Sequence, residues 1–160
     1  MLSNNDVIRR LRYAFDFNDE TLVAIFKEAG FSVGRADVLA WTKKDFAEGF
    51  KEMSDPELGA FLDGLINKNR GKKEGYECEP TKHLDNNLIL RKLKIAFNFR
   101  NEDIIEIVGL GGKKLGKSEL TAFFRKPEHK HYRICQDQIL RNFLSGLALN
   151  ERSNQETKAD

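Results

Sequence analysis

Apolar residues recur along this chain with the spacing of amphipathic helices. The first stripe lies at positions i, i+1, i+4, i+7 and i+8 and is formed by Val7, Ile8, Leu11, Ala14 and Phe15. It predicts a helix that begins near Asn4, with Ser3 as its N-terminal cap. No segment shows a sustained alternation of apolar and polar residues. The pattern therefore predicts an all-α fold.

Three further helices are predicted in the same half of the chain. One begins at Asp19 and ends at Gly30, because glycine readily adopts the left-handed conformation that terminates a helix. The next begins at Gly34. The fourth begins with Asp55 as its cap, followed by Pro56 in the first turn, where a missing N–H costs nothing. Helices this short are marginal alone, so most phenylalanines are assigned to a packed core.

The second half of the chain repeats the first at a constant offset of 82, from residues 4 and 86 to residues 68 and 150, with no gap. Nineteen of these 65 pairs are identical. This indicates an internal duplication. The predicted organisation is a first helical repeat (1–69), a linker (70–85), a second helical repeat (86–150) and a disordered tail (151–160). We expect two tandem four-helix repeats packed with approximate twofold pseudo-symmetry.

Both copies carry the motif F-L-x-G-L near their ends, at 61–65 and 143–147. Glycine inside a helix costs about 1 kcal/mol relative to alanine, so its presence in both copies needs a reason. We expect that Gly64 and Gly146 permit a close helix–helix approach between the two repeats.

Composition and charge narrow the class of protein. The longest stretch without a charged residue is nine residues, from 142 to 150, which is too short to cross a bilayer. The N-terminus is charged where a signal peptide would be apolar. Two cysteines, Cys78 and Cys135, fit a reducing compartment better than a disulfide framework. These features predict a cytoplasmic protein with no membrane partner.

Several segments resemble the bacterial YehS-like family, a group of small duplicated proteins with no assigned function. They are NNDVIRRLRYAF, FLDGLINKNRGK, NNLILRKLKIAF and KPEHKHYRICQDQILRNFLSGLA. Within the last segment the family's spacing is matched by Pro127, His129, Lys130, Tyr132, Arg133, Cys135, Asp137, Gln138, Leu140, Arg141, Phe143, Leu144, Gly146 and Leu147. The resemblance runs from about residue 2 to 149. It implies a helical fold and a cytoplasmic bacterial protein, and it supplies no reaction, cofactor or catalytic residue.

The second repeat contains a basic unit with helix-turn-helix order. Its predicted second and third helices are joined by a short glycine-containing turn. Between residues 109 and 134 there are seven Lys/Arg against two Glu, whereas residues 27–52 of the first repeat hold five of each sign. The candidate nucleic-acid contacts are Lys113, Lys114, Lys117, Arg125, Lys126, Lys130 and Arg133. The alternative interpretation is a solvated basic face. It is favoured because helices joined by a short turn are common in helical proteins, and because the sequence pI of about 8.5 lies below the strongly basic range of dedicated nucleic-acid binders.

The chain has few residues suited to metal or thiol chemistry. The weak metal candidates are His129, His131 and Cys135, whose spacing is not that of a standard zinc site. Cys135 with His131 could also form a thiol–base pair on a helix, but Cys135 matches Met53 of the first repeat, which indicates an apolar position.

No cofactor fingerprint or catalytic triad is present, so we expect neither a cofactor nor catalytic residues. The sequence favours a non-catalytic interaction module with an unknown protein partner. The alternative is binding of DNA or RNA through the basic unit of the second repeat.

Overall fold

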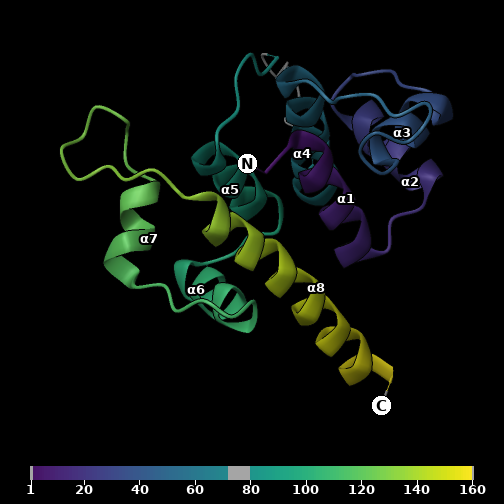
Figure 1. The fold of residues 1–160 in the computed structure, drawn as a ribbon. Coiled ribbons are helices and arrows are strands. Elements are labelled where there is room, and N and C mark those ends of the chain that lie inside the picture. Colours follow the sequence, from purple (N-terminus) through teal and green to yellow (C-terminus); the bar gives the residue numbers. More distant parts are fainter. Residues whose placement is uncertain (1, 72–79, 160) are drawn as a thin grey trace.

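The computed structural model describes residues 2–71 and 80–159. Within these ranges it contains helices and no strands (Figure 1). The first repeat forms α1 (Asn4–Phe15), α2 (Asp19–Glu28), α3 (Arg35–Thr42) and α4 (Asp55–Arg70). The second forms α5 (Asn86–Ala96), α6 (Asn101–Leu110), α7 (Lys117–Phe123) and α8 (Asp137–Ala159). The all-α fold class and the duplication of a four-helix unit are confirmed.

The helix boundaries follow from local capping. The Ser3 side chain accepts a hydrogen bond from the backbone N–H of Asp6 at the start of α1, as predicted. Gly30 has a φ of +73°, the left-handed conformation expected after α2. At α4 the cap is Ser54 rather than Asp55, because Ser54 and Glu57 form a reciprocal capping box. Asp55 is instead the first residue of α4, and its carboxylate is free to contact other segments.

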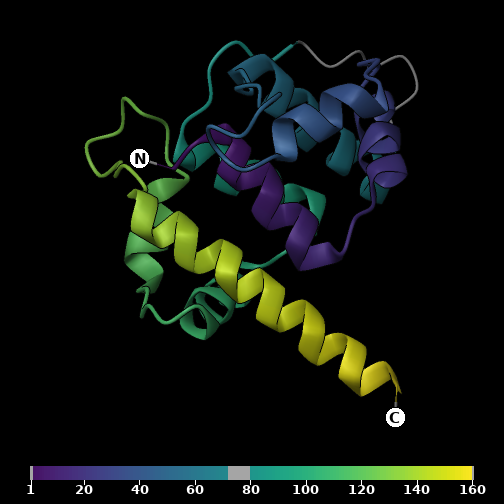
Figure 2. The same ribbon diagram turned by 45° about the vertical axis from the view of Figure 1, so that its right-hand side comes forward.

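The two repeats pack with the first helix of each against the fourth helix of the other. Helix α1 contacts α8, and α4 contacts α5. Figures 1 and 2 both show α1 and α8 side by side. Within each repeat the second helix packs on the fourth, α2 on α4 and α6 on α8. Exchanging the repeats reproduces these contacts, which is the expected approximate twofold relationship.

A continuous apolar core runs through both repeats. In the first repeat, Phe26, Trp41 and Phe61 are among the largest fully buried side chains. The rings of Trp41 and Phe61 each pack against the ring of Phe26, with centroid distances of 5.4 Å. Phe143, which matches Phe61, is fully buried in the second repeat. The apolar stripe positions that match between the two repeats therefore form the core.

The two matched glycines allow a close helix–helix contact, but the contact lies within each repeat rather than between them. A Cβ atom on Gly64 would lie 1.9 Å from the carbonyl oxygen of Ile25 on α2. A Cβ atom on Gly146 would lie 1.8 Å from the carbonyl oxygen of Ile107 on α6. The expectation of an inter-repeat contact was wrong, because the second helix of the same repeat approaches the fourth at this point.

The segments outside the repeats were predicted from composition alone. In the predicted linker, Arg70 is the last residue of α4, residues 80–85 are irregular, and residues 72–79, which include Cys78, lie outside the described residues. The expected tail differs from the structure, in which α8 continues to Ala159. The side chain of Arg152 lies over the ring of Tyr13 on α1, which gives this extension a contact with the first repeat.

Across the described ranges, none of the helices combines the length and apolar character that crossing a bilayer would require.

Candidate functional site

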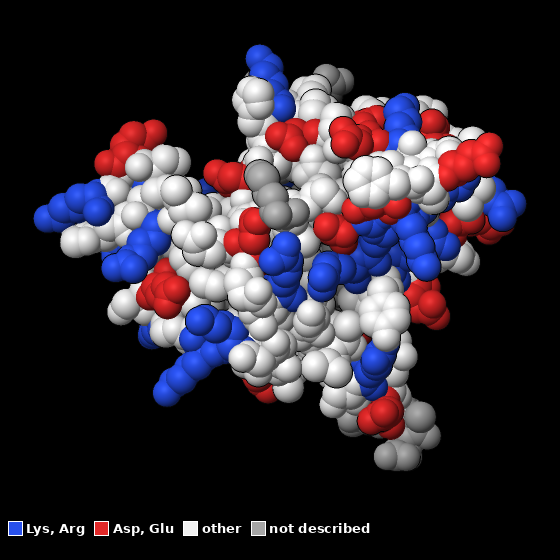
Figure 3. All heavy atoms as spheres, viewed as in Figure 1, with Lys and Arg blue, Asp and Glu red and all other residues white. Residues whose placement is uncertain are grey.

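The seven cationic side chains predicted to contact nucleic acid are all exposed, and they divide between the two ends of α7. Lys113, Lys114 and Lys117 precede or open this helix, and Arg125, Lys126, Lys130 and Arg133 follow it. Figure 1 shows the two connecting segments at opposite ends of α7. In Figure 3, basic and acidic side chains alternate on the side that carries α7. The cations therefore form two groups rather than one continuous patch on this face.

The four cations after α7 belong to a loop that differs in charge from its counterpart in the first repeat. A cavity of about 340 Å³ beside this loop is lined by Arg91, Arg125 and Lys126 against one carboxylate, Asp85. The equivalent cavity of the first repeat, of about 300 Å³, is lined by the carboxylates of Asp45 and Glu52, with no Lys or Arg in its described lining. The difference in local charge between the two repeats therefore appears in the structure as one cavity lined mainly by cations and one lined by carboxylates.

The weak metal candidates do not converge. The rings of His129 and His131 lie in the exposed loop with centroids 5.6 Å apart, whereas Cys135 is fully buried. Within the residues that the structure describes, no group of three or more His, Cys, Asp or Glu side chains is arranged to hold a metal ion. The Nδ1 atom of His129 instead accepts a hydrogen bond from the backbone N–H of His131.

Cys135 is held as a structural residue. Its backbone N–H donates to Oδ1 of Asn87 at 2.9 Å, and its thiol lies near the carbonyl oxygen of Gln136 at 3.7 Å. Burial, together with the nearby carboxylates of Asp137 and Glu119, raises the pKa of the thiol to about 12. Nucleophilic thiols need a lowered pKa, so this environment opposes thiol catalysis.

A buried asparagine in each repeat braces the loop between the third and fourth helices. The side-chain amide of Asn5 donates to the carbonyl oxygens of Trp41 and Lys51, both at 2.9 Å, and its oxygen accepts from the N–H of Met53. Asn87 makes the same three hydrogen bonds in the second repeat. Each asparagine fixes both ends of its loop to the first helix of its repeat.

The braced loop of the first repeat, residues 43–53, presents one aromatic ring to solvent. Phe46 is 100% exposed, and its φ of +66° lies in the left-handed region that bulky residues rarely occupy. The guanidinium of Arg9 donates to the carbonyl oxygen of Lys43 at 2.6 Å and to the carboxylate of Asp45 at 3.1 Å. The segment on either side of Phe46 is therefore held while the ring itself packs against nothing.

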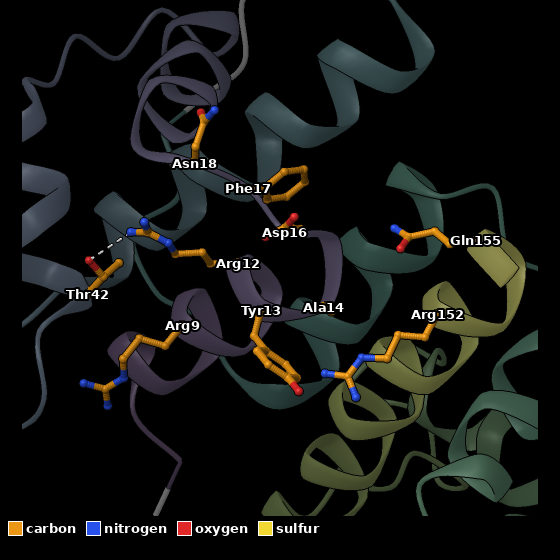
Figure 4. A pocket seen from close by; sticks show the side chains of 10 residues that line it. All are labelled: Arg9, Arg12, Tyr13, Ala14, Asp16, Phe17, Asn18, Thr42, Arg152 and Gln155. Carbon is orange, nitrogen blue, oxygen red and sulfur yellow. Dashed lines mark hydrogen bonds between the residues drawn. The ribbon is translucent and has the colours of Figure 1, made fainter. Parts of the chain in front are cut away.

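A second feature is the groove between α1 and α8. We call it the α1–α8 groove, and its lining includes Arg10, Tyr13, Leu144, Ser145, Leu149 and Arg152, together with the ion pair of Asp6 and Arg9. It adjoins a cavity of about 820 Å³, and both hollows are lined by Arg9, Tyr13 and Arg152. Figure 4 shows the Arg152 and Tyr13 side chains pointing toward one another from α8 and α1. Basic side chains gather over α1 in Figure 3.

The comparisons with known proteins agree with this duplicated architecture. The family model described as "Protein of unknown function (DUF1456)" matches twice, at residues 4–71 and 86–153. The chain belongs to the DUF1456 family. It is also 39% identical over 152 residues to a protein of Escherichia coli (strain K12) described as "Uncharacterized protein YehS", covering 94% of this chain and 97% of the relative. No solved structure matches the chain.

Each DUF1456 copy corresponds to one four-helix unit, so functional differences between the copies can be read position by position. Phe46 of the first copy is matched by Glu128 of the second, and Ser145 of the second is matched by Asp63 of the first. Neither position was singled out from sequence. The exposure of a phenylalanine and the contact partner of a serine both depend on packing between segments distant in sequence.

Proposed function

We propose that this DUF1456 protein is a cytoplasmic, non-catalytic interaction module that binds a partner protein through the loop carrying Phe46. The observation that carries the proposal is the complete exposure of Phe46 at a left-handed φ of +66°. For a residue with a Cβ atom this conformation costs about 1–2 kcal/mol. Strained residues of this kind cluster at ligand clamps and other functional sites.

The loop geometry suits an anchor residue. Aromatic side chains are enriched at the centres of protein interfaces, where they fill a pocket of the partner. An anchor binds more tightly when its loop loses little freedom on binding. Hydrogen bonds that the loop makes with the side chains of Asn5 and Arg9 already fix the 43–53 loop in the free protein. The partner proposed here is a protein with an apolar pocket of the size of a phenyl ring.

The proposal that the module is non-catalytic is supported by the environment of Cys135. This thiol is fully buried and has a raised pKa. His131, the base suggested for it, lies in the exposed part of the 125–135 loop. The thiol–base pair considered from sequence therefore lacks both an accessible nucleophile and a setting that would activate it.

The proposal is tested by affinity capture from bacterial extract with quantitative mass spectrometry. Three baits are compared: the native chain, Phe46→Ser and the matched control Tyr13→Ser. Tyr13 is 64% exposed and lies outside the 43–53 loop, so both substitutions remove an exposed ring without disturbing the core. We expect at least one protein to be retained by the native chain and by Tyr13→Ser, and lost with Phe46→Ser. Identical retention by all three baits would contradict the proposal.

Nucleic-acid binding through the second repeat is the alternative function. Its support is the cationic character of the cavity lined by Arg91, Arg125 and Lys126, compared with the acidic cavity of the first repeat. Seven cations limit the contacts to about seven phosphates, so log affinity would fall against log salt with a slope no steeper than about −6. Gel shifts at low salt with duplex DNA, single-stranded DNA and RNA provide the measurement.

The charge variants separate the alternative from non-specific attraction. Replacing Lys117, Arg125 and Lys130 together with Glu should abolish such binding and preserve the helical signal, because exposed charges contribute little to stability. The matched change at Arg35 and Lys43 of the first repeat should have a much smaller effect. Absence of a shift at tens of micromolar protein would exclude this function.

A further inference from the structure

The α1–α8 groove differs from its pseudo-symmetric counterpart between α5 and α4. On the counterpart side, the ammonium of Lys92 on α5 forms an ion pair with the carboxylate of Asp63 on α4, with Nζ and Oδ1 2.5 Å apart. The two side chains are only 16% and 10% exposed. This buried pair joins the repeats and neutralises the cation of α5 at the helix contact.

The α1–α8 groove contains a cation that corresponds to Lys92 but no carboxylate that corresponds to Asp63. Arg10 occupies the position of Lys92, and Ser145 occupies the position of Asp63. Arg10 Nη1 lies 3.5 Å from the hydroxyl oxygen of Ser145, which is a weak contact. Among the described residues no carboxylate forms an ion pair with Arg10. The groove therefore holds a guanidinium whose matching anion is missing.

The other charged groups that line the groove have partners of their own. The carboxylate of Asp6 lines the groove but pairs with Arg9 at 2.6 Å. Arg12, in the adjoining cavity, pairs with Asp19 at 2.8 Å. Asp16 lines that adjoining cavity but not the groove itself. Arg152 lies over the Tyr13 ring at 4.7 Å from the ring centroid.

Most of the exposed lining of the groove is apolar. The groove has a volume of about 490 Å³, and its apolar lining is formed by the Tyr13 ring, Leu144, Ala148 and Leu149. Tyr13 and Leu149 are 64% and 46% exposed. A cationic group beside an exposed ring and aliphatic side chains matches a ligand that has an aromatic body and an acidic group.

We propose that the α1–α8 groove binds a small aromatic anion. Its carboxylate, phosphate or sulfonate group pairs with Arg10 and takes the position that the Asp63 carboxylate takes on the counterpart side. Its ring lies between Tyr13 and the aliphatic side chains of α8. This site does not involve the 43–53 loop, so it stands or fails independently of partner binding through Phe46.

The test uses 1-naphthyl phosphate as the anionic probe and 1-naphthol as the matched neutral probe, with affinities measured by isothermal titration calorimetry. A charge-assisted hydrogen bond to Arg10 is expected to make the phosphate bind at least about ten-fold more tightly than the naphthol. Equal affinities, or no detectable binding of 1-naphthyl phosphate at millimolar concentration, would overturn the proposal.

Two variants at one position then locate the site. Ser145→Asp places an internal carboxylate opposite Arg10, as Asp63 stands opposite Lys92, and should lower the affinity for 1-naphthyl phosphate at least about ten-fold. Ser145→Asn introduces a side chain of nearly the same size as aspartate but without its charge, and this variant should bind the probe like the native chain. Position 145 is exposed, so neither change disturbs the core. Native-like affinity of Ser145→Asp would show that the probe binds elsewhere and would overturn the proposal.

Discussion

The backbone N–H of Leu2 donates a hydrogen bond to Oδ2 of Asp137 at 3.1 Å, joining the N-terminus to the first residue of α8. The pseudo-symmetric relationship is present as well, because the N–H of Leu84 donates to Oδ2 of Asp55 at 3.0 Å. In both cases the other carboxylate oxygen accepts from an asparagine on the first helix of the same repeat, Asn86 of α5 for Asp137 and Asn4 of α1 for Asp55. Two equivalent carboxylates, Asp137 and Asp55, therefore each connect the first helix of their own repeat to the segment that precedes the first helix of the other repeat.

The first prediction concerns the acid stability that Asp137 contributes. Hydrogen bonds from Asn86 and from the Leu2 backbone lower the pKa of this carboxyl below its ordinary value of 3.8. The ionised form then stabilises the fold above about pH 4, and this stabilisation is lost as the pH falls through the folded-state pKa. Urea unfolding between pH 6 and pH 2.5 should therefore give a steeper acid decline for the native chain than for Asp137→Asn. Parallel declines would contradict this role of Asp137.

The second prediction concerns the two glycines at the helix contacts. Alanine at Gly64 or Gly146 would place a Cβ atom within 2 Å of a carbonyl oxygen, so the packed helices must separate. We expect each change to reduce the free energy of unfolding by about 3 kcal/mol. Gly109→Ala is the control, because nothing lies within 4 Å of its Cβ position in α6 and alanine is the better helix former. Chemical denaturation should give a stability for Gly109→Ala at or above the native value.

The third prediction concerns the reactivity of Cys135. Because burial raises the pKa of this thiol to about 12, it should not react with a disulfide reagent such as Ellman's reagent in the folded protein at pH 8. The measurement uses a Cys78→Ser background, so that only one thiol contributes. Reaction should appear when urea unfolds the chain. Rapid reaction of the folded protein would show that the thiol is accessible and would contradict its assignment as a buried structural residue.

Much of the fold could be predicted because the duplication doubles the information on each helix. Apolar stripes at matched positions gave the helix at Asn4 and its counterpart at Asn86, and Gly30 marked the end of α2. Periodicity identifies which face of a helix is buried but not which helix covers that face. The packing of the first helix of each repeat against the fourth helix of the other could therefore not be predicted from sequence. The same holds for the contacts of Gly64 and Gly146 within each repeat.

The candidate sites were less predictable for the same reason. A run of lysine and arginine is visible in sequence, so the cations around α7 were found, although their separation to the two ends of the helix was not. The left-handed conformation of Phe46 carries no signal in sequence, because phenylalanine is not a residue that favours positive φ. The replacement of a carboxylate by Ser145 opposite Arg10 is recognised only once Ser145 and Asp63 are seen at equivalent contacts between the repeats.

The fourth prediction isolates the backbone strain at Phe46. At ordinary negative φ, alanine stabilises a chain relative to glycine, whereas at a left-handed position the order is reversed. With the ring fully exposed, neither replacement loses buried surface. Phe46→Gly should therefore be more stable to urea than Phe46→Ala by about 1 kcal/mol. If the alanine variant is the more stable of the two, the loop does not hold residue 46 in a left-handed conformation.

The central claim is that Phe46 is the contact point for a partner protein, and photo-crosslinking at this position tests it most directly. The photoreactive phenylalanine analogue p-benzoylphenylalanine is placed at position 46, or at the equivalent position of Glu128 as the matched control, in growing bacterial cells. After irradiation, we predict a discrete adduct between the chain carrying the analogue at position 46 and one other protein, and no such adduct from position 128. The absence of an adduct from position 46, or the same adducts from both positions, would contradict the claim.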